Sequence, residues 1–140
     1  MKERATVVCW QRGKILLVAK EQRRWNLPGG KLEIGEEPSH AALRELGEET
    51  TLSGIELSYL FRFDGPRRRH HVFGVQIGTD RLARPSSEIS QCCWIHPRVL
   101  PMVATGLATR AIVDLACLRE RRITEARLAT LNSTQDEIFP

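Results

Sequence analysis

Short apolar runs separated by polar turns mark the beginning of the chain. Residues 6–10 and 15–19 are apolar and largely β-prone, and the polar segment 11–14 lies between them. Two such runs around a short turn predict a β-hairpin. After a charged loop, residues 25–30 read Trp-Asn-Leu-Pro-Gly-Gly. The proline and the paired glycines exclude regular structure there and leave backbone groups exposed.

The pattern then changes to helix and back to strand. A helix is predicted from Pro38 to about Thr50, because proline suits the first helical turn and two glutamates precede it, near the positive end of the helix dipole. Asp-Gly and Gly-Pro pairs in the segment 64–70 indicate a reversal between two strands. The predicted strands are residues 55–63, 71–77 and 92–95.

The last predicted element is a second helix from about Thr105, with one apolar stripe at positions 107, 111, 115 and 118. The order of strands, helix, strands and helix predicts a mixed β-sheet with packed helices, in the α/β or α+β class. The pattern fades beyond Arg122. We therefore expect one domain over residues 1–122 and a C-terminal extension over 123–140 that is partly helical or disordered.

The composition fits one ordinary soluble domain. Of the 140 residues, 27% are charged and 41% hydrophobic, which excludes collagen-like, coiled-coil and largely disordered classes. No apolar run approaches the ~20 residues of a membrane span, and no secretory segment follows the charged start, so we expect a cytoplasmic protein without a membrane partner.

The four cysteines lack metal-ligand spacing and are expected to be reduced. The net charge of +4 favours anionic partners.

Three glutamates, Glu45, Glu48 and Glu49, lie at positions i, i+3 and i+4 of the first predicted helix. This spacing puts their carboxylates on one face, where like-charge pairs cost roughly 0.2–0.5 kcal/mol each. Arg44 offsets only part of that charge. A hard divalent cation such as Mg²⁺, which prefers oxygen ligands, would supply the rest. Acidic helix faces are also commonly just solvated, and the helix alone leaves both interpretations open.

The surrounding residues favour the metal site. The box motif of Nudix hydrolases closely resembles the pattern Gly30-x5-Glu36-x7-Arg44-Glu45-Leu46-x-Glu48-Glu49-x-Thr51-Leu52. The segment 25–29 and the stretch 88–94 also resemble MutT-type members, so the resemblance covers about residues 5–120. It implies a Nudix-type α/β/α sandwich, with helices on both faces of a mixed sheet, and hydrolysis of a phosphoric anhydride.

The resemblance also implies roles for individual residues. Metal binding and catalysis would fall to Glu45, Glu48 and Glu49, with Glu45 as the candidate base and Arg44 orienting it. The metal would be Mg²⁺, for which Mn²⁺ could substitute. Further roles would fall to Gly30 and Glu36 as structural residues of the box, and to the Gly29 carbonyl and Glu88 as additional metal ligands. Glu88 is equally well explained as an exposed loop acid.

Three more residues bear on the site. Lys31 could contact a substrate phosphate or be a solvated surface lysine. Trp25 could stack on a base or pack beside its apolar neighbours. Thr51 stands where the family has glycine, at a helix exit that often needs the left-handed backbone conformation, which threonine resists.

We expect a magnesium-dependent pyrophosphohydrolase acting on a small nucleotide, with (deoxy)nucleoside triphosphates as the leading substrates, in a monomer or homodimer. ADP-ribose, nucleotide sugars and an RNA 5′ end are alternatives, the last not favoured. Nudix members specific for oxidised guanine nucleotides place an asparagine near the start of the last helix, where this chain has Ala-Thr-Gly at residues 104–106. This difference argues against that specificity. A non-hydrolytic regulatory module is disfavoured because every box glutamate is present. Nucleic-acid binding through the basic segments 67–71 and 119–122 is a third hypothesis.

Overall fold

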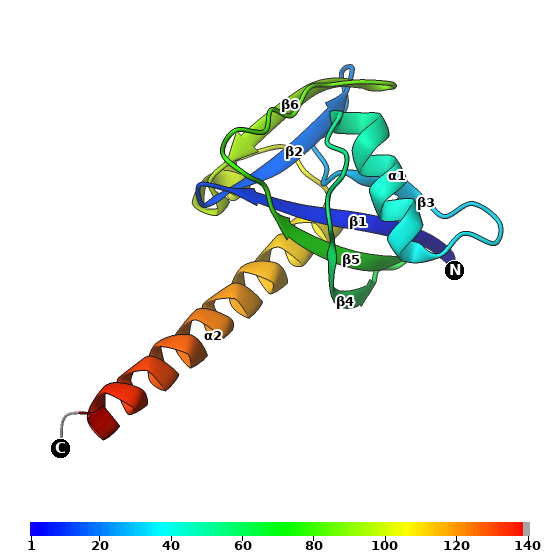
Figure 1. Ribbon diagram of the computed structural model, residues 1–140. Helices are drawn as coiled ribbons and strands as arrows, with labels where there is room; N and C mark the ends of the chain where they lie inside the picture. Colours follow the sequence, from blue (N-terminus) through cyan, green and yellow to red (C-terminus); the bar gives the residue numbers. More distant parts are fainter. Residues whose placement is uncertain (139–140) are drawn as a thin grey trace.

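A six-stranded mixed sheet forms the centre of the molecule in the computed structural model, which describes residues 1–138 (Figure 1). The strand order is β4-β5-β1-β2-β6, with β3 paired to β1 outside this path. The strands are β1 (Lys2–Gln11), β2 (Lys14–Lys20), β3 (Gly29–Lys31), β4 (Ser58–Asp64), β5 (Arg68–Gln76) and β6 (Ile89–Ile95). The two predicted hairpins are confirmed as the antiparallel pairs β1–β2 and β4–β5.

Strand β1 organises the sheet because it pairs with three other strands. It runs parallel to β5 along most of its length. On its other edge it pairs with β2 at Trp10 and Gln11 and with β3 at Arg4, Ala5 and Thr6. The glycine-rich segment Gly29–Lys31 therefore lies beside the first half of β1.

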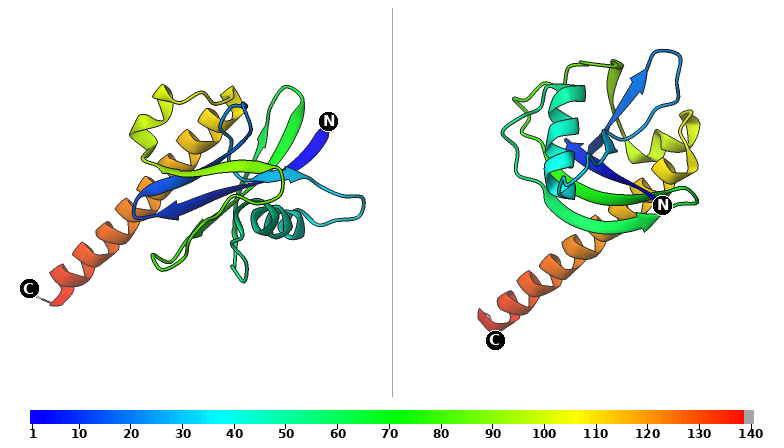
Figure 2. Two further views of the ribbon diagram at one scale, coloured as in Figure 1. Left: turned by 90° about the horizontal axis from the view of Figure 1, so that it is seen from above. Right: turned by 90° about the vertical axis from the view of Figure 1, so that its right-hand side faces the viewer.

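Helices cover both faces of the sheet, as predicted (Figure 2). Helix α1 (Pro38–Thr50) packs on one face and buries Ala41, Ala42 and Leu46 against alternate residues of β1. The 3₁₀ helix η1 (Pro97–Met102) and the first turns of α2 (Leu107–Ile138) pack on the other face, where they share a second apolar cluster with Val8 and Leu17. The alternation of side chains along β1 divides the core between these two clusters.

Several element bounds differ from the prediction. Strand β5 begins at Arg68 rather than 71, because its pairing with β1 extends to the end of that strand at Lys2. Strand β6 begins at Ile89 rather than 92, and η1 was not predicted. Helix α2 continues past residue 122 to Ile138, and its far half projects away from the sheet (Figure 1). A domain boundary at residue 122 stays a prediction. No helix within residues 1–138 combines the length and hydropathy needed to cross a bilayer.

Candidate active site

Helix α1 carries its apolar and acidic residues on different faces. Pro38 stands in the first turn, and the helix ends where Thr51 adopts a left-handed backbone (φ 63°) and donates its N–H to the Gly47 carbonyl at 3.0 Å. Leu46 and its apolar neighbours face the core, whereas the residues one position before it and two or three positions after it line a pocket. These residues are Glu45, Glu48 and Glu49.

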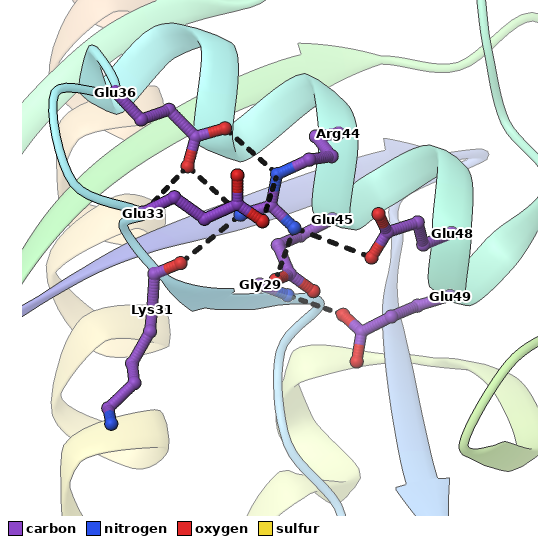
Figure 3. Close-up of polar contacts among 8 residues, drawn as sticks. All are labelled: Gly29, Lys31, Glu33, Glu36, Arg44, Glu45, Glu48 and Glu49. Atoms are coloured by element: carbon purple, nitrogen blue, oxygen red, sulfur yellow. Dashed lines mark hydrogen bonds and ion pairs between the residues drawn. The ribbon is translucent and has the colours of Figure 1, made fainter.

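Arg44 binds much of this acidic face (Figure 3). Its guanidinium donates to Glu36 at 2.8 and 3.0 Å, to Glu45 at 2.9 Å and to Glu48 at 3.4 Å. It also donates to the backbone carbonyl of Lys31 at 3.2 Å. The Arg44 hydrogen bond lowers the pKa of the Glu36 carboxyl to about 2, with a backbone hydrogen bond from Glu33 adding to the effect. Arg44 thereby ties the loop before α1 to the glutamates within it.

Glu49 has a different partner. Its Oε1 accepts a 2.7 Å hydrogen bond from the backbone N–H of Gly29. Burial raises the pKa of the Glu49 carboxyl to about 7, and the nearby charge of Glu45 raises it further, while the Gly29 hydrogen bond opposes the shift. The carboxylate is thus held close to the loop, and within the described residues it forms no ion pair with an arginine.

The two glycines of this loop permit close approaches. Gly29 has φ 149°, and a Cβ there would overlap the Ala5 carbonyl of β1. A Cβ on Gly30 would overlap the Glu45 carboxyl. A larger residue at Gly29 would separate the loop from β1, and a larger residue at Gly30 would displace the Glu45 carboxylate. The Gly29 contact seen here is made by its N–H, and metal binding by its carbonyl stays a prediction.

A pocket of about 950 Å³ brings these groups together. Its lining includes Glu45, Glu48 and Glu49 from α1, and Glu88 from the loop before β6. Glu88 is exposed and pairs with Lys20 at 2.9 Å. The basic residues that line the pocket are Lys2, Arg4, Lys20, Arg23, Arg24, Lys31 and Arg68. An acidic patch for a cation and a basic surround for an anion therefore share one cavity.

The two candidate substrate-binding residues occupy different places. Lys31 is exposed and lines the pocket. Trp25 is partly buried, packs against the α2-side apolar cluster and donates its backbone N–H to the Ala104 carbonyl at 2.9 Å. Trp25 does not belong to the pocket lining in the described part of the chain, so its position favours the packing interpretation.

The donor set fits a hard divalent cation. Among residues 1–138, no three acidic, histidine or cysteine side chains converge as a coordination group. The physical reason is visible, because Glu45 and Glu48 turn toward Arg44 while Glu49 turns toward Gly29. Each of these carboxylates can be reoriented by rotation about its own side-chain bonds, and all offer oxygen, the ligand that Mg²⁺ and Mn²⁺ prefer.

Comparison with known proteins identifies the family. The NUDIX domain model matches residues 1–113. The chain belongs to the Nudix family. A Nudix family structure from Chromobacterium violaceum superposes with a TM-score of 0.74 at 29% identity, covering 98% of this chain and 96% of that one. The expected class, a hydrolase of phosphoric anhydrides, is confirmed at the level of the family.

Curated relatives of this Nudix chain agree with that assignment. A Bacillus subtilis protein named "Putative 8-oxo-dGTP diphosphatase" is 31% identical over 105 residues, which cover 72% of this chain and 70% of the relative. A Mycobacterium tuberculosis protein named "Putative mutator protein MutT4" is 30% identical over 112 residues, 71% of this chain. The match spans less than half of the mycobacterial relative, 45% of its length.

Sequence reasoning missed three basic residues of the Nudix pocket: Lys2, Arg4 and Arg68. Lys2 and Arg4 alternate with Glu3 at the start of β1, and alternation alone predicts that the two cations share one face. Arg68 was predicted in the turn between two strands, within a basic segment considered for nucleic-acid binding. It instead lies in β5, where its pairing with Lys2 of β1 brings it to the pocket.

Proposed function

We propose that this Nudix chain is a metal-dependent pyrophosphohydrolase that cleaves a diphosphate bond in a nucleotide, with nucleoside triphosphates as the leading substrates. The observation that supports this most directly is the placement of three carboxylates of α1 inside a pocket rimmed by seven lysines and arginines. A cation site within a basic cavity suits a substrate that carries several phosphates.

Glu45, Glu48 and Glu49 would hold the Mg²⁺ or Mn²⁺ ion, with Glu88 as a further ligand from the loop before β6. A bound ion of this kind neutralises phosphate charge and lowers the pKa of a coordinated water. Glu45 would accept the proton of that water, since Arg44 holds its carboxylate at 2.9 Å in a fixed orientation. The remaining catalysis comes from positioning, to which the Gly29–Glu49 contact and the Arg44 network contribute.

Two other functions are less well supported. A regulatory module that binds nucleotides without hydrolysis would not need the carboxylates and their orienting arginine, all of which are present and bonded together. Nucleic-acid binding through the segment 67–71 is weakened because four of its residues lie within strand β5, and His71 pairs with Glu3 at 3.1 Å. ADP-ribose, nucleotide sugars and 5′-triphosphorylated RNA belong in the substrate panel.

The test is hydrolysis of a panel of nucleoside triphosphates, nucleotide sugars, ADP-ribose and 5′-triphosphorylated RNA with and without Mg²⁺. Wild type is compared with Glu49→Gln and with Glu56→Gln, which changes an exposed glutamate outside the pocket. We expect magnesium-dependent release of phosphate or pyrophosphate that Glu49→Gln abolishes and Glu56→Gln preserves. Nucleotide binding without turnover in the wild type would instead identify a regulatory module.

A further inference from the structure

Four cations project from one face of three adjacent strands. Arg4 in β1 stands directly opposite Lys31 in β3, and Lys2 in β1 stands directly opposite Arg68 in β5. Because directly paired residues of neighbouring strands share a face, and because Lys2 and Arg4 are two apart on β1, all four side chains start from the same side of the sheet. We call Lys2, Arg4, Lys31 and Arg68 the basic row.

The basic row has no anionic partner of its own. Like charges directly opposite each other destabilise a sheet, yet no ion pair within the described residues joins any member of the row to a carboxylate. Arg4 is partly buried and donates to the Leu27 carbonyl at 3.3 Å, which leaves most of its five N–H donors for another ligand. Burial lowers the Arg4 pKa, and the charge of Arg68 lowers it further, although Glu49 and Glu45 oppose this.

All four residues line the pocket that holds the candidate metal ligands. In Figure 3 the Lys31 side chain extends away from the Arg44 network, so its ammonium group is not used to neutralise the glutamates. Positive charge is also supplied to the lining by Arg23 and Arg24, and no aromatic side chain of the described chain lines this pocket. Aromatic side chains, which most often stack on a base, are therefore missing from the described part of this lining, whereas its charged groups suit phosphates.

We propose that the basic row is a second phosphate-binding subsite, which selects substrates that carry at least one phosphate beyond the diphosphate that a metal ion on the α1 carboxylates would bind. The proposal rests on the hydrolase activity proposed above and adds a substrate class to it: compounds with three or more phosphates, recognised by those phosphates rather than by a base. Nucleoside triphosphates and tetraphosphates belong to this class, and so do multiply phosphorylated cyclitols. Nucleotide sugars and ADP-ribose, with two phosphates, do not.

The activity test compares a nucleoside di-, tri- and tetraphosphate of one base, and triphosphates of four bases. We expect kcat/KM to rise with phosphate number and to differ little between bases. Arg4→Gln should reduce the preference for three phosphates over two by about tenfold or more, through KM, which is the effect of losing one charge-assisted contact. Arg110→Gln removes the same charge from an exposed site outside the pocket and should preserve the preference. Equal losses on all substrates in Arg4→Gln would overturn the proposal.

A binding test separates this proposal from the hydrolase assignment. Inorganic tripolyphosphate and pyrophosphate are titrated into metal-free protein by calorimetry, so no turnover is required. We expect tripolyphosphate to bind more tightly, with Kd weakened about tenfold by Arg4→Gln and also by Lys31→Gln, an exposed substitution with little risk to folding. Arg4→Lys should restore part of the affinity. Absence of tripolyphosphate binding, or variants without effect, would refute the subsite even if the protein hydrolyses nucleotides.

The same titration distinguishes the two sources of phosphate. Inositol hexakisphosphate and a nucleoside tetraphosphate are each used to displace tripolyphosphate. Stronger displacement by the cyclitol would assign the row to phosphorylated polyols, and stronger displacement by the nucleotide would assign it to nucleoside polyphosphates. Failure of both to displace tripolyphosphate would contradict the proposal.

Discussion

The backbone N–H of Gly29 donates a 2.7 Å hydrogen bond to Glu49 Oε1 across 20 residues of sequence. This contact joins the start of β3 to the last turn of α1, in addition to the bond from Arg44 to the Lys31 carbonyl. It leaves the second Glu49 oxygen available for a metal ion. Glu49 is therefore the carboxylate whose removal tests metal binding with the least disturbance of the Arg44 network.

Glu49→Gln should lower kcat by about 100-fold or more. Removing a residue that only supports the metal ligands typically reduces activity about 10–100-fold, and removing a ligand itself should reduce it further. The glutamine oxygen can still accept the Gly29 hydrogen bond, so the melting temperature of the metal-free protein should change by only a few degrees. Added Mg²⁺ should raise the melting temperature of the wild type and of Glu56→Gln but not of Glu49→Gln. The measurements are steady-state kinetics and thermal melts with and without metal. An unfolded Glu49→Gln protein, or one with wild-type turnover, would contradict this role.

Gly30→Ala should displace the Glu45 carboxylate, because the added methyl group would occupy its position. We expect a loss of activity of about 10–100-fold, comparable to that for misplaced supporting groups around a metal site. Gly47→Ala is the matched control, since its added Cβ meets the Leu52 carbonyl at 3.7 Å, an ordinary contact, and Gly47 does not line the pocket. Activity and far-UV circular dichroism are measured for both. Full activity in Gly30→Ala would show that Glu45 need not hold this position.

Thr51→Gly should stabilise the protein by about 0.5–1 kcal/mol. Thr51 has φ 63°, a conformation that costs a non-glycine residue roughly 1–2 kcal/mol. Glycine removes this cost, but it also increases the entropy of the unfolded chain, which offsets part of the gain in stability. Its side chain is exposed, so little packing is lost. Denaturant unfolding measures the change, and Thr51→Ala should fall near the wild type. A destabilised Thr51→Gly would mean that the threonine side chain contributes more than its backbone strain costs.

Local signals in the sequence predicted those parts of the fold that depend on local chemistry. Helix α1 begins at Pro38 and ends at Thr50 as expected, because a proline start and a capping position are short-range features. The helix exit was not settled by the same signals, because threonine resists the left-handed conformation that this position often needs, and the structure shows Thr51 in that conformation at φ 63°. The grouping of three carboxylates on one face follows from helical spacing alone.

Long-range pairing determined what the sequence did not reveal. The parallel register of β1 with β5 brings Arg68 beside Lys2, and no local pattern identifies the partner of a parallel strand. The pairing of β3 with β1 likewise sets Lys31 opposite Arg4. The basic row is therefore a property of the sheet, whereas the acidic face is a property of one helix.

His70 makes a prediction about acid stability that does not involve the candidate metal ligands. It is buried, its Nδ1 lies 2.9 Å from Thr6 Oγ1, and burial lowers its pKa to about 4, with the charges of Arg4 and Arg68 adding to the shift. The unfolded chain binds the proton more readily, near pH 6.5. The stabilisation from neutral His70 is therefore fully present above pH 6.5 and is lost as the pH falls from 6.5 toward 4. The loss amounts to about 3 kcal/mol at most.

The difference in unfolding free energy between wild type and His70→Asn isolates this effect. Other groups titrate in the same range, and Glu49, with its raised pKa, favours folding as the pH falls, opposite to His70. Subtracting the two proteins cancels Glu49, because it is present in both. In metal-free urea titrations from pH 7.5 to 4, the wild type should lose its advantage over His70→Asn as the pH falls. Parallel curves for wild type and His70→Asn would mean that the buried ring accepts its proton as easily as the unfolded chain does.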